Sequence, residues 1–169
     1  MGIRRLNHAV LYVSDVERSV TFYRDVLGFR VVHQGPGMAF LRAADSDNDH
    51  DLGLFGAGAS TVRDGRPTVG LYHLAWSVQT LTELAGFERA LAESGALVGS
   101  SDHVVSKSLY GKDPDGIEFE VSWLLPADLI TDDALAARSR IGRLDLAREK
   151  ARYGGATRGG VGVSVVPAG

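Results

Sequence analysis

The chain contains an internal duplication. Residues 6–13 and 71–78 each form a strand-like run with a single histidine near the start, His8 in the first run and His73 in the second. The two histidines are 65 residues apart, and Phe22 and Phe87 match at the same offset. A repeat of this kind restricts the fold to two copies of one small module, with the two histidines at equivalent positions.

Each strand-like run is followed by the start of a helix. The pattern Ser14-x-x-Glu17 in the first copy and Thr80-x-x-Glu83 in the second has the form of a capping box. Apolar residues then recur at helical spacing, and Gly28 and Gly95 stand where the two helices would end. Each copy therefore begins as a strand followed by an amphipathic helix.

Three short strands are predicted after each helix. They cover residues 29–33, 38–42 and 51–55 in the first copy and 96–98, 106–110 and 117–123 in the second. We therefore predict an α+β fold of two tandem β-α-β-β-β modules, with halves of about 1–56 and 70–126, in one domain spanning 1–126. Their strands are expected to form a curved mixed sheet, a half-barrel around a metal site.

Three segments lie outside the repeated modules. Residues 56–70 are rich in glycine and are predicted to be a plain connection between the halves, with a lid as the alternative. Residues 127–153 are rich in alanine and arginine and are predicted to form a C-terminal helix. Residues 154–169 are predicted to be a tail, either disordered or added as an edge strand.

The segment from His103 to Glu120 carries the most chemistry. Asp113-Pro-Asp-Gly is a tight-turn sequence, so the chain is expected to reverse there from one strand into another. Because side chains alternate along a strand, Glu118, Glu120 and Ser122 should share one face of the second strand. A histidine, a phenol at Tyr110 and carboxylates around one turn indicate a metal site with an acid/base group beside it.

These residues resemble the vicinal oxygen chelate superfamily, which includes glyoxalases, extradiol dioxygenases, epimerases and antibiotic-resistance proteins. The likeness covers about residues 4–125. The segment from His103 to Glu120 is similar to the signature of type I extradiol dioxygenases: a histidine, an aliphatic-tyrosine pair, an acidic-proline pair, a glycine and a glutamate. It departs from that signature mildly at Ser101. The resemblance implies that His8, His73 and Glu120 are the metal ligands, and it places His50, His103 and Tyr110 around the substrate.

The implied chemistry is ring cleavage of a catechol-like aromatic diol by O₂. Two imidazoles and one carboxylate on one face of a metal leave adjacent positions open, the arrangement typical of non-haem Fe(II) oxygenases. Proton transfer from the diol and to oxygen requires acid/base groups within hydrogen-bond reach, for which His50, His103 and Tyr110 are the candidates. The chain has no cysteine, so the ligands are nitrogen and oxygen atoms, which suit Fe(II) first and also Mn, Ni or Zn.

The candidate histidines have alternative structural interpretations, and the protein has two alternative functions. A histidine in a strand is more often a structural group than a ligand, and the polar stretch around His50 is also typical of a solvated loop. A glyoxalase- or epimerase-like lyase or isomerase would need a fourth ligand, for which Asp51 or a water molecule is available. The third possibility is a protein that binds aromatic antibiotics or related ligands, because a fold alone does not decide function.

Composition sets the remaining expectations. The chain has 169 residues, 44% of them hydrophobic, which suits one ordinary globular domain. No run is long and apolar enough for a membrane span and no signal-peptide pattern is found, so we expect a cytoplasmic protein without a membrane partner. A net charge of −3 gives no reason to expect nucleic acid. The expected partners are a small aromatic substrate, O₂ and further copies of the chain in a homo-oligomer.

Overall fold

The computed structural model describes residues 6–58 and 70–160, which fall into two compact units. The first unit is built from the chain up to Thr68 together with the turn Asp113–Ile117. The second contains the rest of the chain, from Val69 to Lys112 and from Glu118 onward. The linker from 59 to 69 and the end of the tail, 161–169, lie outside the described residues.

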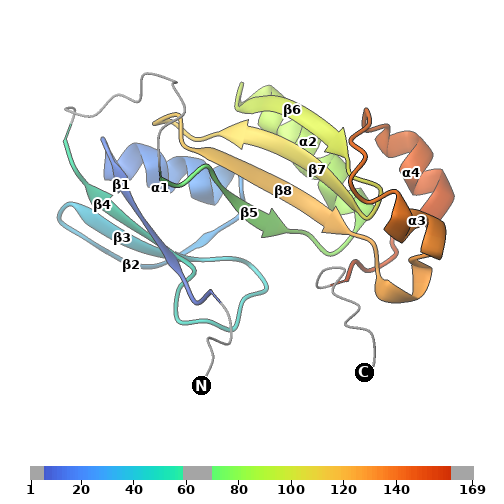
Figure 1. The fold of residues 1–169 in the computed structure, drawn as a ribbon. Helices are drawn as coiled ribbons and strands as arrows, with labels where there is room; N and C mark the ends of the chain where they lie inside the picture. Colours follow the sequence, from blue (N-terminus) through green and yellow to red (C-terminus); the bar gives the residue numbers. More distant parts are fainter. Residues whose placement is uncertain (1–5, 59–69, 161–169) are drawn as a thin grey trace. The chain divides into compact units, whose positions relative to one another are not determined.

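The first unit is a four-stranded mixed sheet with one helix (Figure 1). Its elements are β1 (Ala9–Val13), α1 (Val16–Asp25), β2 (Arg30–Gly35), β3 (Met38–Arg42) and β4 (Leu52–Gly56). The strand order is β1-β4-β3-β2, with β1 and β4 parallel and the other pairs antiparallel. The helix α1 packs on β2, β3 and β4 and buries Val16, Val20 and Tyr23 against them.

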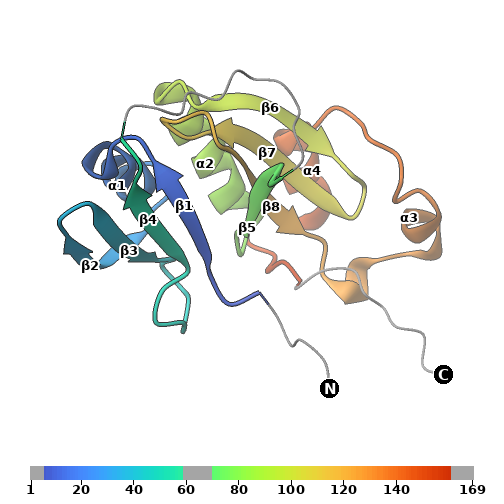
Figure 2. The same ribbon diagram turned by 60° about the vertical axis from the view of Figure 1, so that its left-hand side comes forward.

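The second unit repeats this arrangement (Figure 2). Its elements are β5 (His73–Ser77), α2 (Leu81–Glu93), β6 (Leu97–Asp102), β7 (Ser106–Lys112) and β8 (Glu118–Leu124). The strand order is β5-β8-β7-β6, again with only the first pair parallel. Two β-α-β-β-β modules are thus confirmed, and their described strands pair as two separate four-stranded sheets.

The two helices begin differently. Thr80 caps α2 in the predicted capping box, because its side chain accepts from the backbone N–H of Glu83 while the Glu83 side chain accepts from the backbone of Thr80. In α1 the predicted cap at Ser14 is wrong by one residue, since Asp15 accepts from the N–H of Arg18. The Ser14 hydroxyl instead donates to Asp115 over 2.5 Å and accepts from the guanidinium group of Arg18 over 2.8 Å.

The predicted turn between β7 and β8 is held by Asp113. Its Oδ1 accepts from the backbone N–H groups of Asp115 and Ile117, at 2.9 and 2.8 Å, and Gly116 adopts φ +77°. Tyr23 of α1 donates its hydroxyl to Asp113 Oδ2 over 3.1 Å. Burial and the charge of Asp113 raise the pKa of Tyr23 well above its usual value, which keeps the phenol protonated as a donor.

The single helix predicted for residues 127–153 is wrong. The chain forms three short helical segments there: the 3₁₀ turn η1 (Ala127–Leu129), α3 (Asp132–Ala136) and α4 (Leu146–Tyr153). Between α3 and α4 the backbone of Gly142 pairs with Asp102 at the end of β6 through two hydrogen bonds of 2.8 and 2.9 Å. A residue paired to a strand cannot continue a helix, so α4 restarts at a new cap, Asp145.

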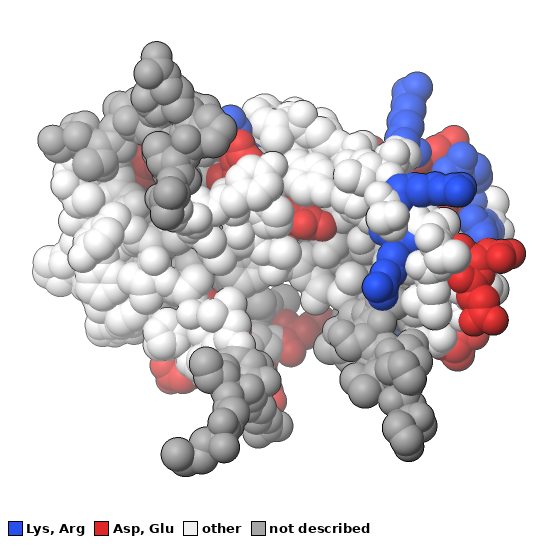
Figure 3. All heavy atoms as spheres, viewed as in Figure 1, with Lys and Arg blue, Asp and Glu red and all other residues white. Residues whose placement is uncertain are grey.

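The C-terminal part of the chain packs on the second unit. The helix α4 lies against α2, and the first residues of the tail are tied down by backbone bonds from Gly159 to Gln79 and from Gly160 to Leu124. Lys and Arg side chains on the face shown in Figure 3 gather around α3 and α4, with Asp and Glu among them. Among the described residues no helix has the length and apolarity of a membrane span.

Candidate metal and acid/base site

A histidine and a carboxylate face one another on the second sheet. His73 begins β5 and Glu120 lies on the neighbouring strand β8, and the distance from His73 Nε2 to Glu120 Oε2 is 3.3 Å. Two ligands bound side by side to one metal at about 2.1 Å each lie about 3 Å apart. The pair therefore has the spacing of two neighbouring ligands of one cation. The other ring nitrogen, Nδ1 of His73, is buried and has no hydrogen-bond partner among the described residues.

Two of the three predicted acid/base residues meet on the same sheet. Tyr110 pairs with Glu120 across β7 and β8, and its hydroxyl lies 2.8 Å from Nε2 of His103. Burial and the charge of Glu120 raise the pKa of Tyr110, while hydrogen bonds with Ser101 and Ser108 act in the opposite direction. The phenol is therefore protonated near neutral pH, next to an imidazole with which it can exchange a proton.

Ser108 is a member of this group that the sequence interpretation missed. Its hydroxyl donates to Glu120 Oε1 over 2.5 Å, which leaves the other carboxylate oxygen toward His73. The available signal was strand alternation, because Ser108 and Tyr110 are two residues apart on β7 and share a face. A serine that bonds to one oxygen of a carboxylate and orients the other is typical of the hydrogen-bond partners that surround metal ligands.

His8 and His50, the remaining predicted site residues, lie close together in the first unit. The rings of His8 and His50 are 4.6 Å apart between centroids, and Phe40 lies 4.7 Å from the His50 ring. His8 Nδ1 lies 2.7 Å from Asn7 Oδ1 and His50 Nδ1 lies 2.8 Å from Asp49 Oδ2. An Nδ1 that donates to an oxygen leaves Nε2 with the free lone pair, which is the form that binds a metal or accepts a proton.

The predicted ligand triad draws on both units. His8 belongs to the first unit, and His73 and Glu120 belong to the second. Within either unit, the described residues include no group of three His, Asp or Glu side chains that would hold a metal alone. Imidazole nitrogens and a carboxylate oxygen are donors that suit Fe(II) and related divalent ions. That all three residues bind one metal ion stays a prediction.

The duplication allows the position equivalent to Glu120 to be found in the first unit. In the second unit Ala75, two residues after His73, pairs with Glu120, and in the first unit Val10, two residues after His8, pairs with Gly53. A glycine therefore stands where a fourth protein ligand would lie. A Cβ built there would come within 3.3 Å of side-chain atoms of both Phe40 and Val10, so a larger residue would require these side chains to shift.

Asp51 was the remaining candidate for a fourth ligand, and its carboxylate is already used by the preceding loop. One oxygen accepts from Ser46 and from Asn48, at 2.9 and 2.7 Å, and the other accepts from the backbone N–H of Ala43 over 2.9 Å. These bonds explain the polar composition of the stretch before β4. They make Asp51 a structural residue of this loop.

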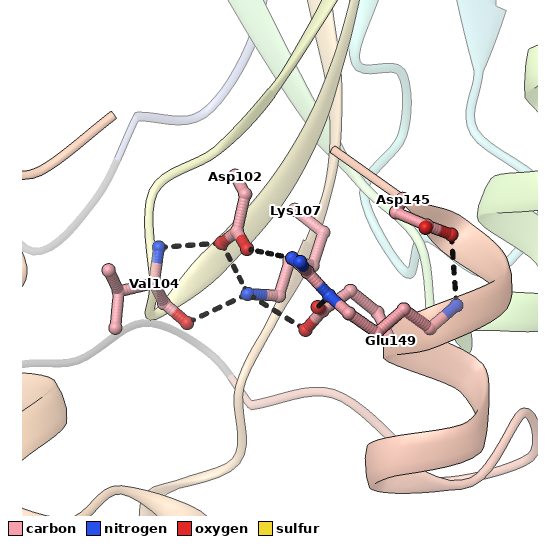
Figure 4. Close-up of polar contacts among 6 residues, drawn as sticks. Asp102, Val104, Lys107, Asp145 and Glu149 are labelled. Carbon is pink, nitrogen blue, oxygen red and sulfur yellow. Dashed lines mark hydrogen bonds and ion pairs between the residues drawn. The ribbon is translucent and has the colours of Figure 1, made fainter. Parts of the chain in front are cut away.

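Behind His103 lies a charged cluster that the sequence interpretation also missed, defined here as Asp102, Lys107, Arg148 and Glu149 (Figure 4). Lys107 is 1% exposed, and its ammonium group contacts Asp102 Oδ1, the carbonyl oxygen of Val104 at 3.0 Å and Glu149 Oε2 at 3.2 Å. Glu149 comes from α4 and is fully buried. Its other carboxylate oxygen accepts from Arg148 over 2.9 Å.

The charged cluster predicts how stability depends on pH. Burial alone would raise the pKa of Asp102, but hydrogen bonds from Lys107 and Val104 and the charges of Lys107 and Arg148 hold it below its usual value. Ionised Asp102 therefore stabilises the fold above about pH 4, the unfolded value, and this contribution is lost as pH falls through the lower folded pKa. We expect Asp102→Asn to be about 2 kcal/mol less stable than wild type at pH 6, with the gap narrowing toward pH 3. Urea unfolding of both proteins at the two pH values measures this, and a constant gap would contradict it.

Comparison with known proteins shows the family to which the chain belongs. The Glyoxalase/Bleomycin resistance protein/Dioxygenase superfamily matches residues 5–121, and the chain belongs to it. The chain is 33% identical over 132 residues to biphenyl-2,3-diol 1,2-dioxygenase 3 of Rhodococcus globerulus, covering 76% of this chain and 68% of that protein. It is 35% identical over 117 residues to catechol-2,3-dioxygenase of Bacillus subtilis, covering 69% of this chain but only 40% of that longer protein.

A solved structure supports the fold assignment. A glyoxalase/dioxygenase from Nostoc punctiforme superposes with a TM-score of 0.59 at 20% identity, over 70% of this chain and 90% of that one. The fold is the mixed α+β fold of the vicinal oxygen chelate proteins. Extradiol dioxygenases are thus among the relatives in sequence, and the family as a whole also includes glyoxalases.

Proposed function

We propose that the protein is an Fe(II)-dependent extradiol dioxygenase that cleaves a catechol-like aromatic diol with O₂. The observation that carries the proposal is the arrangement on the second sheet, where the His73 and Glu120 pair lies beside the Tyr110 and His103 pair. The first pair has the donors and spacing for a divalent metal, and the second has the acid/base groups that the reaction needs. The two dioxygenase relatives support the same assignment.

The residues take separate roles in this proposal. His8, His73 and Glu120 hold the metal, and iron, when bound, supplies neighbouring positions at which a diol and O₂ come together. Ser108 holds the Glu120 carboxylate in place. Tyr110 gives or takes a proton at its hydroxyl, and His103 Nε2 exchanges that proton with it over 2.8 Å. His50, next to His8, is proposed as the base that accepts a proton from the diol.

The first unit favours the dioxygenase over the lyase or isomerase alternative. Those branches use a fourth protein ligand, and here Gly53 occupies the equivalent position while Asp51 is engaged in its loop. Fewer protein ligands leave more positions for two substrates, which suits a reaction between a diol and O₂. The antibiotic-binding alternative would not require the metal-ligand spacing of His73 and Glu120.

The test is oxygen consumption by metal-loaded protein. Protein loaded with Fe(II) without air should take up O₂ when given catechol, 3-methylcatechol or 2,3-dihydroxybiphenyl, and a yellow ring-cleavage product should appear in step. Zinc-loaded protein is the control, because zinc has no redox chemistry, and it should consume none. Iron-loaded protein that binds these diols but never takes up O₂ would favour a binding or isomerase function.

A further inference from the structure

We infer that Glu149 of α4 is a positioning residue for His103, acting through the buried ammonium group of Lys107. The family match ends at residue 121, so α4 lies beyond the segment that the family shares. The inference concerns the geometry of His103 and Tyr110. It rests on the proposed function only where it predicts a rate.

The hairpin that carries His103 is strained. Val104, the residue after His103, has φ +68° and is the one non-glycine residue with positive φ in the described part of the chain. A β-branched residue is disfavoured in this region, and such a conformation persists only where the surroundings hold it. Both backbone groups of Val104 are held, the N–H by Asp102 Oδ1 at 2.8 Å and the carbonyl oxygen by Lys107 Nζ at 3.0 Å.

Lys107 is the centre of this arrangement. Its three contacts are to Asp102 on one side of His103, to Val104 on the other side and to Glu149 on α4. The contacts to Asp102 and Val104 are hydrogen bonds, and the contact to Glu149 Oε2 is an ion pair without hydrogen-bond geometry. Figure 4 shows Lys107 between the hairpin and the helix. Glu149 therefore fixes the ammonium group that fixes both neighbours of His103.

The consequence reaches the acid/base pair. His103 Nε2 meets the Tyr110 hydroxyl at 2.8 Å, and a hydrogen bond of this kind weakens steeply when either group shifts. A misplacement of about 1 Å in a reacting group can lower a rate roughly 100-fold. The helix α4, through the buried carboxylate of Glu149, thus sets the distance between His103 and Tyr110 without a direct bond to either.

The experiment compares three variants. Glu149→Gln keeps the shape of the side chain but removes its charge. The double variant Lys107→Met, Glu149→Gln removes both buried charges and also the bonds that hold Val104, and it leaves Asp102 without its ammonium partner. Leu146→Ala is the matched control, because Leu146 is a buried residue of the same helix and its loss loosens α4 without removing a charge.

The direct readout is the ring nitrogen signals of His103 in NMR spectra of metal-free protein at one pH, assigned with His103→Asn. We expect these signals to move in Glu149→Gln and in the double variant. Leu146→Ala should lower the melting temperature and leave His103 in place. Unmoved His103 signals in Glu149→Gln or in the double variant, or an equal shift in Leu146→Ala, would overturn the inference.

The second readout is the rate of diol cleavage by iron-loaded protein. The two charge-removing variants should lose about 10–100-fold in kcat, with KM and bound metal close to wild type, as expected for a group that orients a functional histidine. A change in KM alone would contradict a positioning role. Wild type that cleaves no diol would remove the proposed function, and the NMR comparison would still decide whether Glu149 positions His103.

Discussion

Glu120→Ala is expected to abolish stoichiometric metal binding while the protein remains folded. The Glu120 carboxylate lies 3.3 Å from His73 Nε2 and supplies the oxygen donor of the proposed triad. Loss of an outer-shell partner lowers metal affinity about 10–100-fold, and loss of a direct ligand should cost more. His73→Ala and His8→Ala should behave alike, because each removes one of the three ligands. Metal content per chain after loading and desalting measures the effect, with circular dichroism to verify the fold.

Glu118→Ala provides the matched control for this experiment. Glu118 is a carboxylate on the same face of β8, two residues before Glu120, and it pairs with Lys112 at 3.5 Å. Its removal should leave metal content unchanged. Full metal occupancy in Glu120→Ala, or equal loss in Glu118→Ala, would show that Glu120 is not a ligand. Full occupancy in His8→Ala alone would place the metal on the second unit without a contribution from the first.

Tyr110→Phe is expected to lower kcat for diol cleavage by about 10²–10⁴-fold, the usual contribution of a general acid or base. The substitution keeps the ring and removes the hydroxyl that meets His103 Nε2, so packing and metal content should be preserved. KM should change little, because a group that acts in the transition state contributes little to substrate binding. Steady-state rates with the iron-loaded proteins measure the effect.

Tyr72→Phe is the control for loss of a nearby hydroxyl. The Tyr72 ring lies 4.7 Å from the His73 ring, close to the same site, and the residue is 72% exposed. We expect loss of the Tyr72 hydroxyl to change kcat by less than about threefold, since this hydroxyl has no proposed role in proton transfer. Equal rates for Tyr110→Phe and wild type would remove Tyr110 from the acid/base chemistry. An equal loss in both variants would indicate a general effect of polarity near His73.

Most of the fold could be predicted from the sequence because strand alternation, helix caps and turns are local signals. The span predicted for β3, residues 38–42, matches the observed strand, and Thr80 begins α2 as its capping box indicates. The alternation on β8 also places Glu120 correctly, with Phe119 and Val121 buried on the opposite face. Each of these features depends on residues within a few positions of one another.

The features that were missed depend on residues far apart in the chain. Asp15 caps α1 while Ser14 bonds to Asp115 and to the Arg18 side chain, and the predicted C-terminal helix is interrupted because Gly142 pairs with Asp102. Lys107 is buried on β7 with Leu109, and its partner Glu149 lies in a later helix. No local pattern identifies a partner at that separation.

Gly53 has a consequence for how the family's activities can interconvert by mutation. A glutamate at this position would restore the symmetry of the two modules, but its Cβ would press on Phe40, which packs against His50. The change would therefore require the side chains of Phe40 and Val10 to give by a few tenths of an ångström. Because Phe40 packs against His50, that shift would be felt by the proposed acid/base residue. We expect a glutamate here to be tolerated better together with a smaller residue at Phe40, so the effects of the two substitutions should not be additive.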